Sequence, residues 1–353
     1  MMYPHIHTSQ SGSVANRVNA FADHDAAEIV EFRRRYLREN TALSPSELPF
    51  DEVADIVKTE FRPAWEESKA LSNRIDASTG EILAYSGFSD FIDLLGVAFE
   101  GEIGCTAVAL RIRGSDGAGP VPFVAQTWDY KVFYRDHSVI VERTPKSGHN
   151  SVSLTTGLGH SYMGVNEAGV TVLINNLQST EAQVGLPFSV VVQALLHRVS
   201  TAREARDELK QLPIMSTHNY LISGKMEAYN IEAGGGIFAA THVDTQQLPW
   251  VHTNHTVHDS LASTIRNYSA SSDRRYERSL ARLREQDANG LVDTDTFDVL
   301  ELFVDHDAPL CRHGETQSDT ATIATVWNTQ VPPSLHVVAG PPCENNSKQE
   351  VSL

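Results

Sequence analysis

The sequence predicts an α+β protein in which helices pack against antiparallel sheets. Apolar residues recur at helical spacing over residues 26–67 and again over residues 270–304. Between these regions, short runs rich in β-branched and aromatic residues alternate with turns containing Gly, Asn and Asp. The helices and strands do not alternate as βαβ units, so the pattern favours a layered sandwich over a parallel sheet.

The first half of the chain divides into a helical part and a strand-rich part. Residues 18–75 are expected to be mostly helical. After Gly87 the composition shifts toward strands, which should dominate from Cys105 to Asn175. The NEAG stretch at residues 166–169 is the clearest hairpin turn in this region.

The second half returns to helix twice. Residues 187–200 and 201–212 predict two helices, and the FSVVVQALL run makes the first so apolar that it should be buried between layers. More strands follow, and then two helices within residues 270–304. Residues 320–342 predict a hairpin that turns at a Pro-Pro pair, and the polar tail, residues 343–353, is expected to be loose.

Charge and cysteine content narrow the classes of partner and compartment. The 353 residues include 28 Lys+Arg and 45 Asp+Glu, and the formal charge of −17 disfavours nucleic acid and anionic membranes as partners. No apolar run is long enough to span a membrane, and the N-terminus lacks the features of a secretory signal, so we expect a cytoplasmic protein. The three cysteines, Cys105, Cys311 and Cys343, are too scattered for a disulfide framework or a CxxC metal site. Reduced thiols are expected.

Cys105 lies directly after a glycine, at the start of the alternating run GCTAVALRIR. A cysteine in this position is often only a small apolar core residue. Its neighbours favour chemistry: Gly104 leaves the preceding carbonyl open to attack, and Thr106 adds a hydroxyl. Asp129 follows in a second strand-like run that could pair with the first, and Asn254 supplies a side-chain amide suited to an oxyanion hole.

These residues belong to an ordered series of short motifs. They are GCT at 104–106, QTWD at 126–129, MGVNEAG at 163–169, HTNH at 252–255, DH at 305–306 with CRH at 311–313, and the closing HVVAGPP at 336–342. Each motif alone is weak, but the series resembles the acyl-coenzyme A:6-aminopenicillanic acid acyltransferase family of N-terminal nucleophile hydrolases. The resemblance implies a four-layer αββα fold and an inactive precursor that cleaves itself before the cysteine.

The resemblance places this cleavage between Gly104 and Cys105. It would leave a helical α segment, residues 1–104, and a β segment, residues 105–353, which carries the nucleophile and the sheet core. The two segments are expected to stay associated. In the cleavage, the Cys105 sulfur attacks the Gly104 carbonyl, an N-to-S acyl shift gives a thioester, and water resolves it. Cys105 then has both a thiol and a free α-amine.

This α-amine can act as the general base. Its ordinary pKa is about 8, close to working pH, whereas that of a lysine side chain is about 10.4. One residue therefore supplies both the nucleophile and its base, and no partner histidine is required. Attack on a substrate carbonyl would give an acyl-enzyme, and water or an amine would take the acyl group.

The resemblance also suggests supporting residues, each with a structural alternative. Asp129 should orient the amine or Thr106, or else is a strand-end carboxylate in a turn. Asn254 should serve the oxyanion hole, or else is a turn asparagine. Arg312 could stabilise the negative intermediate or hold a structural carboxylate. The family often has a second hydroxyl where this chain has Ala107, so Thr106 alone would supply that function.

Three further patterns are set aside, and no metal or other cofactor is expected. His252, His255 and His258 have metal-like spacing but lack a helical HExxH and a supporting Cys or Glu. Residues 293–301 resemble a calcium loop without its glycine. The five arginines of residues 273–285 could contact a coenzyme A phosphate, but a solvated amphipathic helix explains them better.

The sequence therefore predicts a self-processing cysteine amidohydrolase that cleaves the C–N amide bond of a small N-acyl amine or peptide-like molecule. The expected partners are this small-molecule amide or thioester substrate and the protein's own α segment. Hydrolysis is preferred because water is always available as the acceptor. One alternative is an acyl-coenzyme A-dependent N-acyltransferase of the same family. The other is an uncleaved, non-catalytic binding domain in which Cys105 stays buried.

Overall fold

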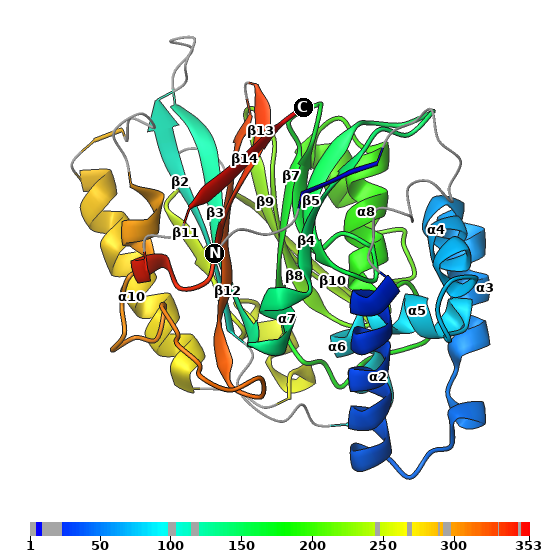
Figure 1. Ribbon diagram of the computed structural model, residues 1–353. Helices are drawn as coiled ribbons and strands as arrows, with labels where there is room; N and C mark the ends of the chain where they lie inside the picture. The colour runs from blue at the N-terminus through cyan, green and yellow to red at the C-terminus, as the bar shows by residue number, and fades with distance from the viewer. Residues whose placement is uncertain are drawn as a thin grey trace.

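The computed structural model describes residues 5–8, 23–97, 104–113, 120–243, 248–266, 270–288, 290–291, 298–330, 332–344 and 347–353. Two sheets lie face to face, and helices cover both outer faces (Figure 1). The predicted α+β class and the four-layer αββα arrangement are confirmed. No helix in the described ranges combines the length and the apolar character that crossing a membrane would require.

The larger sheet has eight strands in the order β1-β4-β5-β6-β7-β8-β9-β10. All its neighbours are antiparallel except β1, which runs parallel to β4. The predicted turn between β6 and β7 is confirmed, since Gly169 N donates to Asn166 O at 2.8 Å. The strands are β1 (His5–Thr8), β4 (Ser138–Arg143), β5 (Ser151–Thr156), β6 (Met163–Asn166), β7 (Thr171–Asn176), β8 (His218–Ser223), β9 (Ala228–Gly234) and β10 (Ile237–Val243).

The smaller sheet has six antiparallel strands in the order β11-β2-β3-β12-β13-β14. The predicted C-terminal hairpin is confirmed as β12 and β13. The expectation of a loose tail is wrong, because β14 pairs with β13 and buries only Val351. Because only one residue of this edge strand is buried, the other residues are polar and the sequence resembles a loop. The strands are β2 (Gly104–Arg113), β3 (Pro120–Lys131), β11 (Trp250–His252), β12 (Thr320–Gln330), β13 (Pro333–Ala339) and β14 (Lys348–Ser352).

The helices before β2 are α2 (Asp23–Asn40), α3 (Phe50–Glu60), α4 (Arg62–Ser72), α5 (Thr79–Ser86) and α6 (Phe88–Leu94), with the short 3-10 helix η1 (Pro45–Glu47). This confirms the predicted helical start over the part of residues 18–75 that is described. The shift to strands expected after Gly87 is wrong for α6. Six of its seven residues are buried, including Ser89, Asp90 and Asp93, which share one face, and seven residues are too few to establish a helical period in the sequence.

The later helices are α7 (Phe133–Asp136), α8 (Phe188–Arg198), α9 (Ala202–Leu209) and α10 (Ala270–Ala288), with the 3-10 helices η2 (Asp259–Thr264), η3 (Val299–Leu302) and η4 (Pro342–Glu344). The prediction that α8 is buried between layers is confirmed, since it contacts β6, β7 and α5. A second long helix before residue 304 is not found in the described residues 298–304, where η3 is only a short turn. The preceding residues 292–297, and most of the calcium-like stretch, lie outside the described residues.

The segment before Cys105 is integrated with the rest of the molecule. The expectation that this segment is helical is wrong for β1, which adds an edge strand to the larger sheet. Two buried carboxylates of α6 bind the later chain: Asp90 Oδ2 accepts from Phe188 N at 2.7 Å, and Asp93 Oδ2 accepts from Ser216 Oγ at 2.6 Å. Burial raises the pKa of Asp93 to about 7 and that of Asp90 well above its usual value.

Candidate active site

Cys105 is the second residue of β2 and lies between the two sheets. Its side chain belongs to the inter-sheet core with Ala107 and Ala109, whereas Val108 and Leu110 pack in a second core beneath α10. Alternation along the strand therefore directs the thiol inward. Cys105 lines a cavity of about 40 Å³ together with Arg33 and the aromatic residues Phe88, Trp128, Tyr130, Tyr162 and Phe188.

The main chain of Cys105 is bound by two side chains from other elements. Its N–H donates to Asn254 Oδ1 at 2.8 Å, and its carbonyl oxygen accepts from Arg275 Nη1 at 2.7 Å. The same arginine donates from Nη2 to Asn254 Oδ1 at 2.9 Å and from Nη1 to Thr106 Oγ1 at 3.1 Å. Asn254 follows β11, and Arg275 projects from α10. The segment after β11 and the helix α10 therefore both contact Cys105.

The expected pairing of β2 with β3 is confirmed, and it places Asp129 opposite Gly104. Asp129 is fully buried. Its Oδ1 accepts from Thr322 Oγ1 at 2.8 Å, and its Oδ2 lies 3.2 Å from Arg312 Nε. Because Gly104 and Cys105 are consecutive in a strand, Asp129 lies on the face opposite the thiol. The carboxylate is therefore close to the Gly104–Cys105 peptide.

The surroundings of Cys105 disfavour a thiolate. Burial raises the pKa of the thiol to about 12, and the negative charge of Asp129 adds to this increase. The positive charge of Arg275 acts in the opposite direction. In the uncut chain Cys105 N is an amide and cannot serve as a base. The thiol is therefore protonated at neutral pH.

The structure brings together all six residues that the sequence singled out: Gly104, Cys105, Thr106, Asp129, Asn254 and Arg312. The orientation of Asn254 adds a detail, because its oxygen faces Cys105 N while its Nδ2 donates to Asn176 O at 3.0 Å. Arg312 contacts the carboxylate of Asp129, as in the second alternative considered for it. Their catalytic roles remain predictions.

Arg275 is the residue that the sequence analysis missed. We expected the arginines of residues 273–285 to be solvated, and this is wrong for Arg275, which is fully buried. Arg274, Arg278 and Arg284 on the same helix are exposed. The available signal was the spacing of Ser271, Arg275, Ser279 and Leu283, a buried stripe on α10 in which two small residues leave room for the guanidinium.

The three histidines near β11 do not form a metal site in the described residues. His252 is buried, and its Nε2 lies 2.9 Å from Glu232 Oε1. His255 Nδ1 contacts Ser272 Oγ at 2.8 Å, on the side of α10. These histidines therefore contact different partners. The group of metal-type ligands found in the described part of the chain lies elsewhere and consists of His306, Cys311, His313 and Cys343.

Comparison with known proteins identifies a family match. Residues 113–342 match the model of the acyl-coenzyme A:6-aminopenicillanic acid acyl-transferase family. No curated protein matches the chain. A mutant conjugated bile acid hydrolase from Clostridium perfringens is similar over 70% of this chain and 92% of its own, with 13% identity and a TM-score of 0.49.

Two further solved structures are similar at this level. Penicillin V acylase from Agrobacterium tumefaciens matches over 70% of this chain and 86% of its own, with 14% identity and a TM-score of 0.46. The Caenorhabditis elegans ortholog of N-acylethanolamine-hydrolyzing acid amidase matches over 64% of this chain and 92% of its own, with 14% identity and a TM-score of 0.45.

Proposed function

The chain belongs to the acyl-coenzyme A:6-aminopenicillanic acid acyl-transferase family, and we propose that it is a self-processing N-terminal cysteine amidohydrolase. It hydrolyses the C–N amide bond of a small N-acyl amine or peptide-like molecule through a thioester acyl-enzyme. One observation carries this proposal: the main-chain N and O of Cys105 both bind polar side chains, those of Asn254 and the fully buried Arg275. Burial of an arginine is costly, and a cysteine that only fills the core would not require it.

Processing begins with attack of Cys105 Sγ on the carbonyl carbon of Gly104. The C–N bond breaks, the thiol proton goes to the departing nitrogen of Cys105, and a thioester joins Gly104 to Sγ. Water then hydrolyses this thioester and leaves a carboxylate on Gly104 and a free thiol on Cys105. The contact from Cys105 N to Asn254 Oδ1 holds the departing nitrogen in place. The products are the α segment, residues 1–104, and the β segment, residues 105–353.

In turnover the new α-amine takes the thiol proton, and the thiolate attacks the substrate carbonyl. Asp129 pairs with Gly104 across β2 and β3, and we assign it to orient the ammonium group, while Arg312 contacts its carboxylate. Asn254 Nδ2 carries a second hydrogen besides the one donated to Asn176 O, and we assign it to the oxyanion hole. Thr106, on β2, accepts a hydrogen bond from Arg275 and helps to hold the guanidinium group of Arg275 in place.

The α segment must stay associated after cleavage, because it supplies part of the cavity beside Cys105. Arg33 of α2 and both Phe88 and Ser89 of α6 line this cavity. Arg33 is also bound across the cleavage site, since its Nε donates to Tyr134 Oη at 3.0 Å. Loss of the α segment would remove one wall of the cavity and expose buried aromatic residues. The α segment is therefore a permanent partner.

The cavity favours a small apolar or flat acyl group. Its aromatic lining includes Trp128 and Tyr162, whose rings pack edge to face at 5.5 Å. A volume of about 40 Å³ has room for only a few water molecules, so a long acyl chain would have to displace these rings. The preference for an apolar or aromatic acyl group rests on these aromatic side chains.

The test is a release assay with processed protein on N-acyl amines of graded acyl length and on acyl-coenzyme A thioesters. Release of free amine from short-chain amides without an added acceptor supports hydrolysis. Acyl transfer that requires an added amine, with little hydrolysis, would instead establish the acyltransferase alternative. Fully processed protein that turns over no substrate would contradict the enzyme assignment. Cys105→Ala serves as the inactive control throughout.

A further inference from the structure

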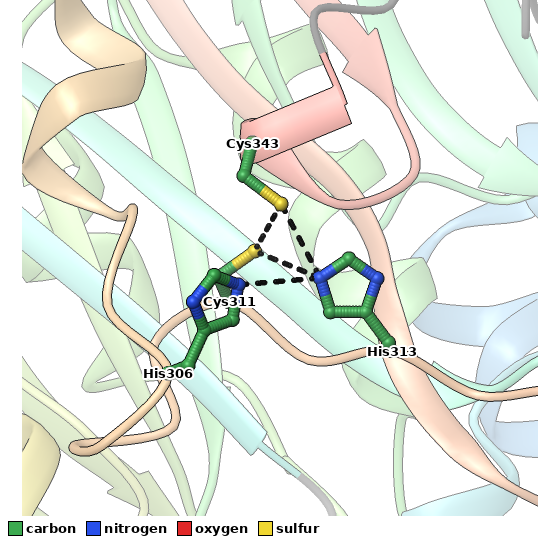
Figure 2. Close-up of side chains that lie close together, drawn as sticks. All are labelled: His306, Cys311, His313 and Cys343. Atoms are coloured by element: carbon green, nitrogen blue, oxygen red, sulfur yellow. Dashed lines mark hydrogen bonds between the residues drawn. The ribbon is translucent and has the colours of Figure 1, made fainter.

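We propose that His306, Cys311, His313 and Cys343 bind one zinc ion in a tetrahedral structural site near the active site. Three of these residues lie on the loop between η3 and β12, and Cys343 belongs to η4 in the C-terminal region. Figure 2 shows the four side chains pointing toward a common centre. Their donor atoms all lie within 4.8 Å of one another.

The distances between these atoms suit a zinc ion. Bonds of about 2.3 Å to sulfur and about 2.0 Å to nitrogen give tetrahedron edges of about 3.8 Å between sulfurs, about 3.5 Å between sulfur and nitrogen, and about 3.3 Å between nitrogens. In the structure the two sulfurs are 3.4 Å apart, and the Nε2 atoms of His306 and His313 are 3.3 Å apart. His313 Nε2 lies 3.7 Å from Cys311 Sγ and 3.2 Å from Cys343 Sγ. Each of these four distances is within about 0.4 Å of its ideal edge. The His306 nitrogen lies within 4.8 Å of both sulfurs, so the His306 side chain has the furthest to move to complete the site.

Hydrogen bonding alone does not explain this convergence. His313 Nε2 faces two sulfurs and a second imidazole nitrogen, but a ring nitrogen offers either one hydrogen or one lone pair. A metal ion at the centre would accept a lone pair from each of the four atoms. Glu344 Oε1 lies 3.3 Å from His313 Nδ1 and can accept a hydrogen bond from the Nδ1–H, which leaves the Nε2 lone pair directed inward. A carboxylate in this position is typical of zinc-bound histidine.

The donor set also selects the metal. Two thiolates and two imidazoles in a tetrahedron favour zinc over magnesium or calcium, which prefer oxygen ligands. Binding would release the thiol protons of Cys311 and Cys343, and the two thiolates would neutralise the charge of the ion. A Cys311–Cys343 disulfide is the competing interpretation. A disulfide would require the distance between the two sulfurs to shorten from 3.4 Å to about 2.05 Å, and it would not explain why the two histidines point at the sulfurs.

The site would hold Arg312 in position, because this residue lies between the ligands Cys311 and His313. Arg312 Nε is 3.2 Å from Asp129 Oδ2, and Arg312 N donates to Thr322 Oγ1 at 3.0 Å. A metal ion that fixes both flanking residues restricts the loop and so restricts the guanidinium. Zinc binding itself does not depend on the proposed function. Only its effect on Asp129, and through it on catalysis, rests on that function.

The first test is the metal content of the full-length chain, purified reduced, free of any affinity tag and without chelator. Elemental analysis should find one zinc per chain. Cys343→Ser and His313→Asn should each lose the metal. Cys105→Ala and His24→Asn are the matched controls and should keep it, since Cys105 lies in the inter-sheet core and the side chain of His24 is 79% exposed.

A second measurement guards against variants that fail to fold. Wild-type protein stripped of zinc and loaded with cobalt should show thiolate-to-cobalt charge-transfer absorption, and chelation should lower the melting temperature reversibly. No bound metal after dialysis of reduced wild-type protein against zinc would overturn the proposal. So would a Cys311–Cys343 disulfide in protein purified anaerobically, or full metal content in Cys343→Ser. Processing and amide hydrolysis are measured on the same samples. Protein that binds no zinc but is cut and active would refute the zinc site and leave the proposed function intact.

Discussion

The carboxylate of Asp129 lies so close to Gly104 that a Cβ atom on Gly104 would be 2.5 Å from Oδ2. Real Cβ atoms do not approach an oxygen this closely, so residue 104 must be glycine while Asp129 keeps its position. The carboxylate in turn is held by Thr322 and Arg312. The residue before the proposed cut is thus constrained by the same group that we expect to orient the new α-amine.

Gly104→Ala should therefore fold but process slowly. Overpacking of this kind costs about 1–3 kcal/mol, which corresponds to about five- to 150-fold in rate if the strain falls on the cleavage step. The uncut fraction is measured over time by denaturing electrophoresis. Gly224→Ala is the control, because its nearest neighbour would lie 3.3 Å from the new Cβ. Normal processing of Gly104→Ala would show that the close contact has no bearing on cleavage.

Arg275 provides the second prediction. Arg275→Gln removes the charge next to the carbonyl oxygen of Cys105 and leaves Asn254 Oδ1 with one donor fewer. By analogy with loss of one electrostatic donor in an active site, kcat/KM should fall by about 100-fold. Arg284→Gln on the exposed face of α10 is the matched control and should retain full activity. Equal activity of the two variants would remove Arg275 from the site.

The reactivity of Cys105 should change on processing. Burial raises the pKa of its thiol to about 12 in the uncut chain, so at pH 8 on the order of one thiol in ten thousand is ionised. Uncut Gly104→Ala protein should thus be alkylated at Cys105 far more slowly than processed wild-type protein. Mass spectrometry of the Cys105 peptide, with the Cys343 peptide as the internal reference, measures both rates. Equal rates would contradict a protonated, shielded thiol before cleavage.

Asp93 predicts how stability depends on pH. Because burial raises its pKa from 3.8 to about 7, folding favours the protonated form. Its contribution to the free energy of unfolding is complete below about pH 4 and is lost as the pH rises through 7, with about 1.4 kcal/mol for each unit of pKa shift. Asp93→Asn removes this titration.

The comparison is best made in the Cys105→Ala background, where the chain stays whole. Denaturant titrations at a series of pH values give the unfolding free energy of this chain with and without the Asp93→Asn substitution. The difference between the two should move in favour of the substituted chain between pH 4 and pH 8. The buried histidines His160 and His218, whose pKa values burial lowers to about 4, titrate in both chains and cancel. A constant difference over this range would show that Asp93 does not titrate as described.

Local patterns in the sequence predicted much of the fold. Runs in which apolar residues alternate predicted that β2 and β3 pair, and therefore that Cys105 and Asp129 lie near each other. The same rules failed for short elements. The seven residues of α6 are too few to establish a helical period, whereas β14 buries only Val351 and its sequence therefore resembles a loop.

The parts of the site that the sequence did not reveal depend on long-range packing. Arg275 has exposed arginine neighbours on the same helix. The small residues Ser271 and Ser279 mark its face of α10, but the position of α10 against β2 shows what buries it. Cys311 and Cys343 appeared scattered because the second lies 30 residues after His313. The β12–β13 hairpin brings the two cysteines together, and no CxxC template describes that geometry.

Self-processing by Cys105 is tested most directly by the intact mass of the purified protein under denaturing conditions, beside that of Cys105→Ala. Wild-type protein should give two fragments that meet between Gly104 and Cys105, with Cys105 as the new N-terminal residue, and the variant should remain a single whole chain. A wild-type chain that stays whole, or a variant that is cut at the same bond, would contradict Cys105 as the processing nucleophile.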